Sequence, residues 1–194
     1  MTPGRTIWIT GLSGAGKSTL AAPVAAALRE QGTQVVLLDG DELRAVFGAS
    51  ATAARSHERD ARLDLALRYA RLCRMLGAQG LTVVIATISL FREVQDWNRQ
   101  NLPGYVEVFL DVPLDELRRR DPKGIYRRYD AGEISDVSGI DVAVDYPLAP
   151  ALHLTRQPAT PDAALPRPAL HHPRRLPTQT PPTPGTAESG TRYG

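Results

Sequence analysis

The stretch Gly11-Leu12-Ser13-Gly14-Ala15-Gly16-Lys17-Ser18 matches the pattern G-x-x-x-x-G-K-[ST] at every fixed position. In such a loop the glycines let consecutive backbone N–H groups point at phosphate oxygens, the lysine reaches the β- and γ-phosphates, and the serine hydroxyl binds Mg²⁺. The stretch therefore predicts a site for ATP and Mg²⁺. The residues expected to form it are Gly11, Ser13, Gly14, Ala15, Gly16, Lys17, Ser18 and Thr19.

The segments on either side of this loop fit the same prediction. Residues 5–10 form a short apolar run typical of a buried strand, and residues 18–31 are rich in alanine and leucine, as in a helix. A helix that starts directly after the loop directs its N-terminal N–H groups at the phosphates. A chance match of common turn residues is the alternative interpretation, and the strand-loop-helix context argues against it.

Strand-like and helix-like segments alternate along the chain as far as residue 146. The apolar runs at 34–39, 81–86 and 105–110 lack alternation, which indicates strands buried on both faces. Apolar residues at helical spacing occupy 57–79, and residues 91–101 and 114–120 are also expected to be helical. This order predicts a three-layer α/β/α fold with a parallel sheet, formed by a domain over residues 1–146.

Residues 147–194 differ in composition from the rest of the chain. They hold eleven of the 16 prolines, and their one aromatic residue is Tyr193. Such a segment cannot bury enough apolar surface to offset the entropy of ordering it, so we expect a disordered tail. A basic arm for nucleic acid is disfavoured because the arginines are scattered. A metal site at His171 and His172 is disfavoured because the pair is isolated.

The net charge of +2 conceals a difference between these two parts. The tail carries five arginines against one aspartate and one glutamate, a net +3, so the first 146 residues carry 2 − 3 = −1. A near-neutral domain has no electrostatic footprint for nucleic acid.

Cys73 is the sole cysteine and is expected in the core. With no apolar leader and no apolar run long enough to span a membrane, we expect a cytoplasmic protein.

Two aspartates follow the apolar run at 34–39, in the stretch Leu38-Asp39-Gly40-Asp41, and Arg44 comes three residues later. Open parallel sheets bind ligands at the carboxyl ends of their strands. We therefore expect Asp39 and Ser18 to hold Mg²⁺, and Asp41 to orient an acceptor hydroxyl or take its proton. Arg44 would bind an anionic substrate. The alternative is a helix cap at Asp41 with Arg44 in solvent.

A dense cluster of cations follows the helix expected at 114–120. The stretch 118–129 combines these cations with Gly124, as expected of a mobile lid that covers phosphates. Such a lid excludes water and neutralises charge on the group being transferred. The alternative, a solvated basic helix face, is expected to hold for some of these residues, including Arg118 and Arg127.

Five stretches taken together resemble the adenylylsulfate kinase (APS kinase) family. They are the phosphate loop, L-D-G-D-x-x-R at 38–44, R-D-P-K-G-I-Y at 120–126, A-G-E-I at 131–134 and S-G-I-D at 138–141. The resemblance covers about residues 5–147. It implies a P-loop kinase that transfers the γ-phosphate of MgATP to the 3′-hydroxyl of a small nucleotide acceptor, adenylyl sulfate. It also implies a homodimer.

The resemblance implies roles for individual residues as well. The catalytic residues would be Lys17, Asp39, Asp41 and Lys123. Phe47 resembles the aromatic residue that stacks on the acceptor base, and Asp141 would lie in the loop after the lid. A cap at the end of the third strand is an equal alternative for Ser89. The residues expected to bind the acceptor are Asp41, Arg44, Phe47, Arg62, Ile88, Ser89, Arg92, Lys123 and Ile140.

The chain departs from the family on the acceptor side and near its end. Residues 87–92 keep Ser89 and Arg92 of the family's F-I-S-P-Y-R, but Gln95 replaces an arginine and Leu65 an asparagine. A related kinase for another nucleotide-linked acceptor, such as cytidine diphosphoramidate, is therefore one alternative, and a nucleotide-binding protein without catalysis is another. The last strand and helix are predicted to be missing or altered. That strand would lie beside the one that precedes the phosphate loop.

Overall fold

The computed structural model describes residues 3–47 and 59–155. Its helices and strands follow the predicted order, with two short helices, α2 and α6, that the sequence reading did not separate. The elements are β1 (Thr6–Thr10), α1 (Lys17–Glu30), β2 (Val35–Asp39), α2 (Gly40–Val46), α3 (Arg59–Ala78), β3 (Thr82–Ala86), α4 (Arg92–Asn101), β4 (Tyr105–Asp111), α5 (Leu114–Arg120), α6 (Ile125–Asp130) and β5 (Leu152–Thr155).

The strands form one parallel sheet in the order β2-β3-β1-β4-β5. β1 lies in the middle, where Ile9 is paired with Ala86 of β3 on one side and Val108 of β4 on the other. Every residue of β1 and β3 is buried, which is why these segments read as unbroken apolar runs rather than as alternating ones.

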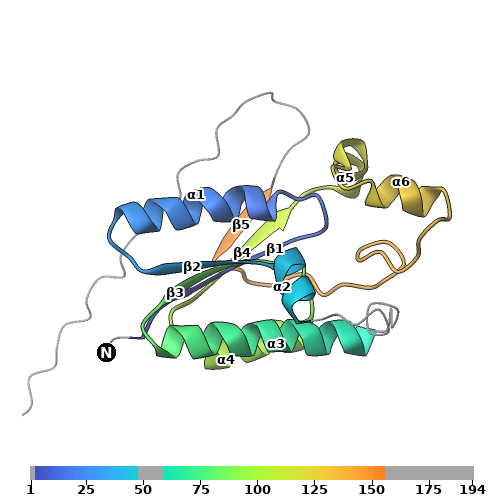
Figure 1. Cartoon of the computed structure of the whole chain (residues 1–194). Coiled ribbons are helices and arrows are strands. Elements are labelled where there is room, and N and C mark those ends of the chain that lie inside the picture. The colour runs from blue at the N-terminus through green and yellow to red at the C-terminus, as the bar shows by residue number, and fades with distance from the viewer. Residues whose placement is uncertain (1–2, 48–58, 156–194) are drawn as a thin grey trace, which may run out of the picture. The chain divides into compact units, whose positions relative to one another are not determined.

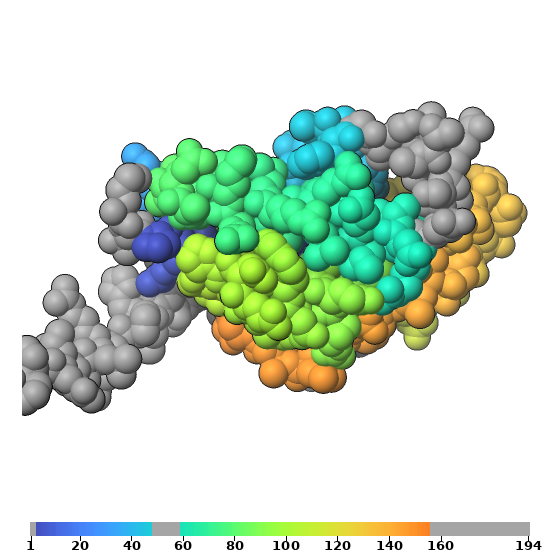
Figure 2. All heavy atoms as spheres, turned by 90° about the horizontal axis from the view of Figure 1, so that it is seen from below, coloured from blue at the N-terminus to red at the C-terminus, as the bar shows by residue number. Residues whose placement is uncertain are grey.

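Helices cover both faces of the sheet, so the predicted three-layer α/β/α fold is confirmed (Figure 1). On one face α1 packs Leu20, Ala21 and Ala25 into a core that also holds Ile7 and Ile9. On the other face α3 and α4 close a second core around Trp8. Figure 2 shows this second face, with α3 and α4 side by side.

The end of the described chain differs from the prediction. Residues 147–155 still belong to the fold, because Leu152–Thr155 forms the edge strand β5. This strand has four residues and pairs with β4, not with the strand that precedes the phosphate loop, so the prediction that the family's last strand and helix are missing or altered stays a prediction. The helix expected after it and the proline-rich tail from residue 156 lie outside the described residues, so the disordered tail stays a prediction.

Two further expectations concern the body of the domain. Cys73 is fully buried on α3, and burial raises the pKa of its thiol to about 12, in keeping with a core residue. Among the described residues, no helix is long and apolar enough to cross a membrane.

Candidate active site

The phosphate loop, residues 11–18, runs from the carboxyl end of β1 into α1, and its glycines adopt backbone angles that other residues avoid. Gly16, at the N-terminus of α1, has φ 93°. Gly11 has φ 150°, and a Cβ there would lie 2.6 Å from the Leu110 carbonyl oxygen of β4. Glycine is thus needed at Gly11 for space as well as for conformation. The loop leads directly to a helix N-terminus, which favours phosphate binding.

Lys17 is folded back onto the phosphate loop. Its Nζ donates a hydrogen bond of 2.8 Å to the Leu12 carbonyl oxygen. Burial, together with the nearby Lys123 ammonium, lowers the pKa of Lys17 from 10.5 to about 8, although Asp41 and Asp39 act in the opposite direction. Because this ammonium group is poorly solvated, a bound phosphate would strongly stabilise its charged form.

Asp39 links the end of β2 to the phosphate loop and to α2. Its Oδ2 lies 2.5 Å from the Ser18 hydroxyl, and its Oδ1 accepts a 2.8 Å hydrogen bond from the Asp41 N–H. The cap of α2 is therefore Asp39, not Asp41 as the alternative interpretation had it. The paired hydroxyl and carboxylate oxygens are hard ligands that suit Mg²⁺.

A metal at this point would need further ligands from outside the protein. Among the described residues no three acidic, histidine or cysteine side chains are grouped to hold a metal ion. Mg²⁺ commonly binds through one or two protein oxygens, with water and substrate phosphates completing its shell. Ser18 and Asp39 fit that arrangement.

Asp41 does not cap α2, and its carboxylate pairs instead with two cations, Lys123 and Arg44. Lys123, from the segment between α5 and α6, forms a hydrogen-bonded ion pair with Asp41 Oδ2. Arg44 Nη1 lies 3.6 Å from Asp41 Oδ1. The hydrogen bond from Lys123 is the main reason why the pKa of Asp41 is lowered, so this carboxylate is ionised at neutral pH.

The segment α5–α6, residues 114–130, corresponds to the predicted lid, and carboxylates on it hold most of its arginines. Glu116 accepts hydrogen bonds from Arg119 and Arg120, at 2.7 and 2.5 Å, and Arg118 pairs with Asp130 at 3.1 Å. Arg127 is 82% exposed. Of the basic residues on this segment, Lys123 is the one that lines the cavity described below. Both Arg118 and Arg127 are paired with a carboxylate of the segment, Asp130 and Asp121, but Arg127 is the more exposed of the two and fits the solvated alternative better.

Tyr126 on α6 is a site residue that sequence reasoning missed. Its side chain is 1% exposed, and its hydroxyl donates a 2.9 Å hydrogen bond to the Ser13 carbonyl oxygen in the phosphate loop. The start of α6 is held by Asp121, whose carboxylate accepts from the N–H groups of Tyr126 and Arg127 at 3.2 and 3.0 Å. The motif containing Tyr126 was noted, but a tyrosine within an apolar helix face gives no local sign of its partner.

A cavity of about 660 Å³ extends from the phosphate loop toward α3 and the segment after β3. Its wall brings together residues from the first third of the chain and from the lid, as predicted. The predicted site residues that line it are Ser13, Gly14, Gly16, Lys17, Ser18, Thr19, Asp39, Asp41, Arg44, Arg62, Ile88, Ser89 and Lys123. Gly11 and Ala15 shape the loop without lining the cavity, and both are buried.

Two of the predicted acceptor residues are held by specific bonds. Arg62 on α3 donates to the Asp136 carbonyl oxygen at 2.5 Å and to the Ser138 hydroxyl at 3.2 Å, and burial lowers its pKa. Ser89, beyond the end of β3, has φ 34°, and its hydroxyl lies 2.8 Å from the Thr87 hydroxyl. Ser89 thus bonds to a neighbouring side chain at the strand end while still facing the cavity.

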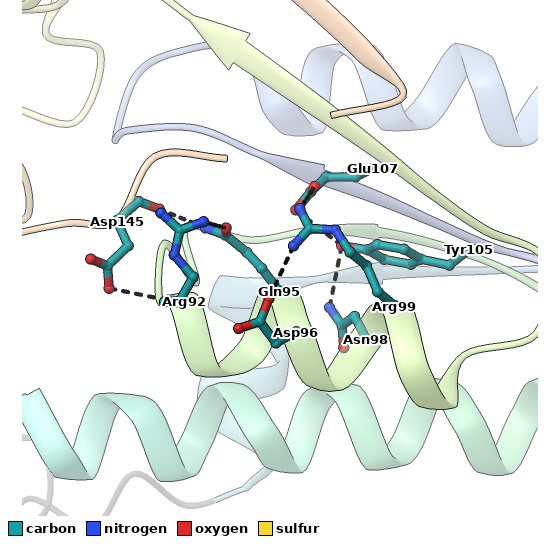
Figure 3. Close-up of polar contacts among 8 residues, drawn as sticks. All are labelled: Arg92, Gln95, Asp96, Asn98, Arg99, Tyr105, Glu107 and Asp145. Carbon is teal, nitrogen blue, oxygen red and sulfur yellow. Dashed lines mark hydrogen bonds and ion pairs between the residues drawn. The ribbon is translucent and has the colours of Figure 1, made fainter. Parts of the chain in front are cut away.

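Three predicted acceptor residues do not line the cavity. Phe47, at the end of α2, packs on Tyr69 of α3 with ring centroids 5.8 Å apart. Arg92 is turned to Gln95, 3.4 Å away, and its N–H donates to the Asp145 carboxylate (Figure 3). Ile140 packs against the core on the α1 face. In each case packing within the protein, rather than the cavity, accounts for the side chain's position.

The cavity is also lined by residues that were not among the predicted site residues. Leu65, Ala66 and Tyr69 come from α3, and Phe91 from the segment before α4. Leu65 is one of the positions at which the chain departs from the family on the acceptor side. Ala66 and Tyr69 read as part of an amphipathic helix facing the core, so their second role has no signal in the sequence. The segment after the lid contributes Asp136, Val137, Ser138, Val142, Ala143 and Val144.

Comparison with known proteins agrees with this geometry. The family model for adenylylsulphate kinase matches residues 3–155. The chain belongs to the adenylylsulphate kinase family. It is therefore a kinase-fold phosphotransferase with an alcohol group as acceptor, and its nucleotide-binding phosphate loop is a family feature.

Individual relatives differ in their acceptors. The chain is 38% identical to the cytidine diphosphoramidate kinase of Campylobacter jejuni over 143 residues, which cover 74% of this chain and 81% of the relative. It is 40% identical to the adenylyl-sulfate kinase of Pseudomonas aeruginosa over 163 residues, which cover 83% and 81%. The structure of the Mycobacterium tuberculosis APS kinase CysC with AMPPNP and APS superposes with a TM-score of 0.71, at 35% identity, and covers 82% of this chain and 92% of that one.

Proposed function

We propose that the protein transfers the γ-phosphate of MgATP to the 3′-hydroxyl of adenylyl sulfate. The observation that carries this proposal is that the phosphate loop and a group of charged side chains line the same cavity. The phosphate loop lies at one end, and Asp41, Arg44, Arg62 and Lys123 lie at the other. A donor phosphate and an anionic nucleotide acceptor would thus meet within one enclosure, which is what in-line phosphoryl transfer requires.

Lys17, Ser18 and Asp39 would serve the donor. The Lys17 ammonium would leave the Leu12 carbonyl for the β- and γ-phosphates, a small movement because Lys17 already lies in the loop. Ser18 and Asp39 would hold Mg²⁺, which neutralises charge on the phosphates during transfer. The backbone N–H groups of the loop and of the start of α1 would orient the phosphates.

Asp41 and Lys123 would serve the reacting groups. The acceptor hydroxyl would displace Lys123 from Asp41, so that the carboxylate orients this hydroxyl and takes its proton, while the ammonium turns to the transferring phosphate. Because the pKa of Asp41 is low, its main contribution would be orientation rather than strong basicity. Arg44 and Arg62 would bind the negative charge of the acceptor.

A cytidine-linked acceptor is the second candidate, and two observations favour it. The Campylobacter jejuni relative that bears this activity in its name is 38% identical over most of both chains. The positions at which the sequence departs from the family also lie on the acceptor side, since Leu65 lines the cavity and Gln95 lies on the nearby α4. The donor chemistry would be the same in both cases.

The test is a direct comparison of acceptors with the purified protein of residues 1–194. MgATP is supplied with adenylyl sulfate or with cytidine diphosphoramidate, and the phosphorylated products are separated by anion-exchange chromatography. We expect a higher kcat/KM for adenylyl sulfate. A higher value for the cytidine compound would replace the first proposal by the second. Nucleotide binding without turnover of either acceptor would defeat both and would leave a binding protein without catalysis.

A further inference from the structure

One wall of the cavity is formed by the segment of residues 136–146, here called the strap, which follows the lid. Its middle residues, Val142, Ala143 and Val144, line the cavity. They lie in neither a helix nor a strand, so the sheet ladder does not hold them in place. Their position depends on how the two ends of the strap are attached.

The first end of the strap is organised by its own hydrogen bonds and by α3. The Asp141 carboxylate accepts from the N–H groups of Asp136 and Val137 at 2.7 and 2.6 Å, which closes a compact turn. Arg62 of α3 holds that turn through the Asp136 carbonyl oxygen and the Ser138 hydroxyl. This end is therefore attached through a residue already assigned to the site.

The second end is attached through Asp145, which uses backbone and side chain together. Its N–H donates to the Leu90 carbonyl oxygen at 2.9 Å. Its carboxylate accepts from the Arg92 N–H at 3.1 Å and lies 3.4 Å from Arg59 Nη2. The guanidinium of Arg59 in turn lies 5.4 Å from the ring centre of Phe91, a cavity residue.

Gln95 completes this attachment from α4. Its side chain is 3% exposed, and its Nε2 donates a 2.6 Å hydrogen bond to the Asp145 carbonyl oxygen (Figure 3). Its Oε1 lies 3.4 Å from Arg92 Nη1. A buried amide with both ends engaged has one well-defined rotamer, so it can fix the distance between α4 and the strap.

Helix α4, which carries Gln95, is itself bonded to the sheet. At the other end of α4, Arg99 Nη2 lies 2.7 Å from the buried Glu107 carboxylate of β4 (Figure 3). The hydroxyl of Tyr105 donates to the same carboxylate at 3.1 Å. Because α4 is thus tied to the sheet, a bond from Gln95 to the strap holds the strap relative to the sheet as well.

We propose that Asp145 and Gln95 are positioning residues that hold the strap as the wall of the acceptor pocket. They do not touch the reacting groups, and they act through Val142, Ala143 and Val144 on one side and through Phe91 on the other. This inference rests on the proposed kinase function. It assigns to Gln95 a role in shaping the acceptor site in place of direct contact with the acceptor.

Kinetics of two variants test the inference. Asp145→Asn keeps the size of the side chain but removes its charge, and Gln95→Leu removes the bond to the Asp145 carbonyl. For each we expect KM for the acceptor to rise roughly 5- to 20-fold, with KM for ATP changed less than about twofold, as for lost ground-state binding. Gln100→Leu, at an exposed glutamine on the same helix, should leave both unchanged.

An equal rise in the KM for the acceptor and the KM for ATP, or no change in either, would overturn the inference. Hydrogen exchange of the nucleotide-free protein provides a second test that does not depend on any acceptor. Peptides covering residues 136–146 should exchange at least about threefold faster in Asp145→Asn than in the wild type, while phosphate-loop peptides stay unchanged. Unaltered exchange in the strap would refute the positioning role. Faster exchange without turnover of any acceptor would support it and defeat the proposed reaction instead.

Discussion

The two ends of the cavity are built in different ways. The proposed donor end consists mainly of one continuous segment, residues 11–19, joined by Asp39 from the end of β2, and the backbone of that segment would supply most of the phosphate-binding groups. The acceptor end is assembled from α2, α3, the segment after β3, the lid and the strap, and its binding groups are side chains. A site made of the backbone of one segment can be recognised from a sequence motif in that segment. A site made of side chains from five segments depends on how these segments pack.

This contrast has a functional meaning. The donor is shared by a very large class of proteins that use the same loop, so its site tolerates little change. The acceptor differs between relatives named for adenylyl sulfate and for cytidine diphosphoramidate. In this chain the two proposed sites lie at the carboxyl ends of strands of one parallel sheet. Variants at each end should separate the two functions.

Loss of the Lys17 ammonium should have the largest effect. Lys17→Ala removes the point charge for the β- and γ-phosphates, so we expect kcat/KM to fall roughly 100-fold or more. Circular dichroism should show an unchanged fold, because the one bond lost is that to the Leu12 carbonyl. Turnover of this variant near the wild-type rate would refute the donor-site assignment.

The Asp41–Lys123 pair tests whether the acceptor end takes part in the chemistry. Asp41→Asn should lower kcat on the order of 100-fold, because the carboxylate that orients the acceptor hydroxyl is lost, with a much smaller effect on KM for ATP. Because the two residues are paired, adding Lys123→Ala should cost far less in the variant than in the wild type. Fully additive losses would show that they act separately.

The pKa of Lys17 predicts a pH dependence of the donor end. The free enzyme loses this charge above pH 8, whereas a bound triphosphate stabilises the ammonium form. We therefore expect affinity for ATP to fall about eightfold from pH 7.5 to pH 9, measured by calorimetry. In Lys17→Met, the same pH change should have little effect. A wild-type affinity that stays constant over this range would contradict the assignment.

The smallest expected effect concerns the contact between lid and loop. Tyr126→Phe removes the bond to the Ser13 carbonyl oxygen and leaves the ring in its buried place. A net loss of about 1 kcal/mol corresponds to roughly fivefold weaker binding of ATP. Tyr129→Phe, on the same helix, is the matched control. If Tyr126→Phe weakened acceptor binding instead, the tyrosine would belong to the other end of the cavity.

Much of the fold followed from local patterns. The strands at 34–39, 81–86 and 105–110 were recognised from their apolar runs, and the structure has a strand at each place. The expected burial on both faces holds for β3, whereas β2 is half-buried at every position because it lies at the edge of the sheet. The edge strand β5 was not recognised, since its residues are largely exposed and its stability comes from pairing with β4. α6 was hidden because its start depends on the carboxylate of Asp121 rather than on composition.

The sequence by itself predicted the phosphate loop of the proposed donor site, because each role in that loop is tied to a residue type at a fixed spacing along a single segment. It also identified the charged residues of the acceptor end through short motifs. Tertiary structure alone decided which of those side chains face the cavity. Arg62 reaches it while Arg92 bonds to Gln95, although both are arginines near the same strand ends. The physical reason is that a side chain's direction is set by its packing and hydrogen-bond partners, and these come from distant parts of the chain.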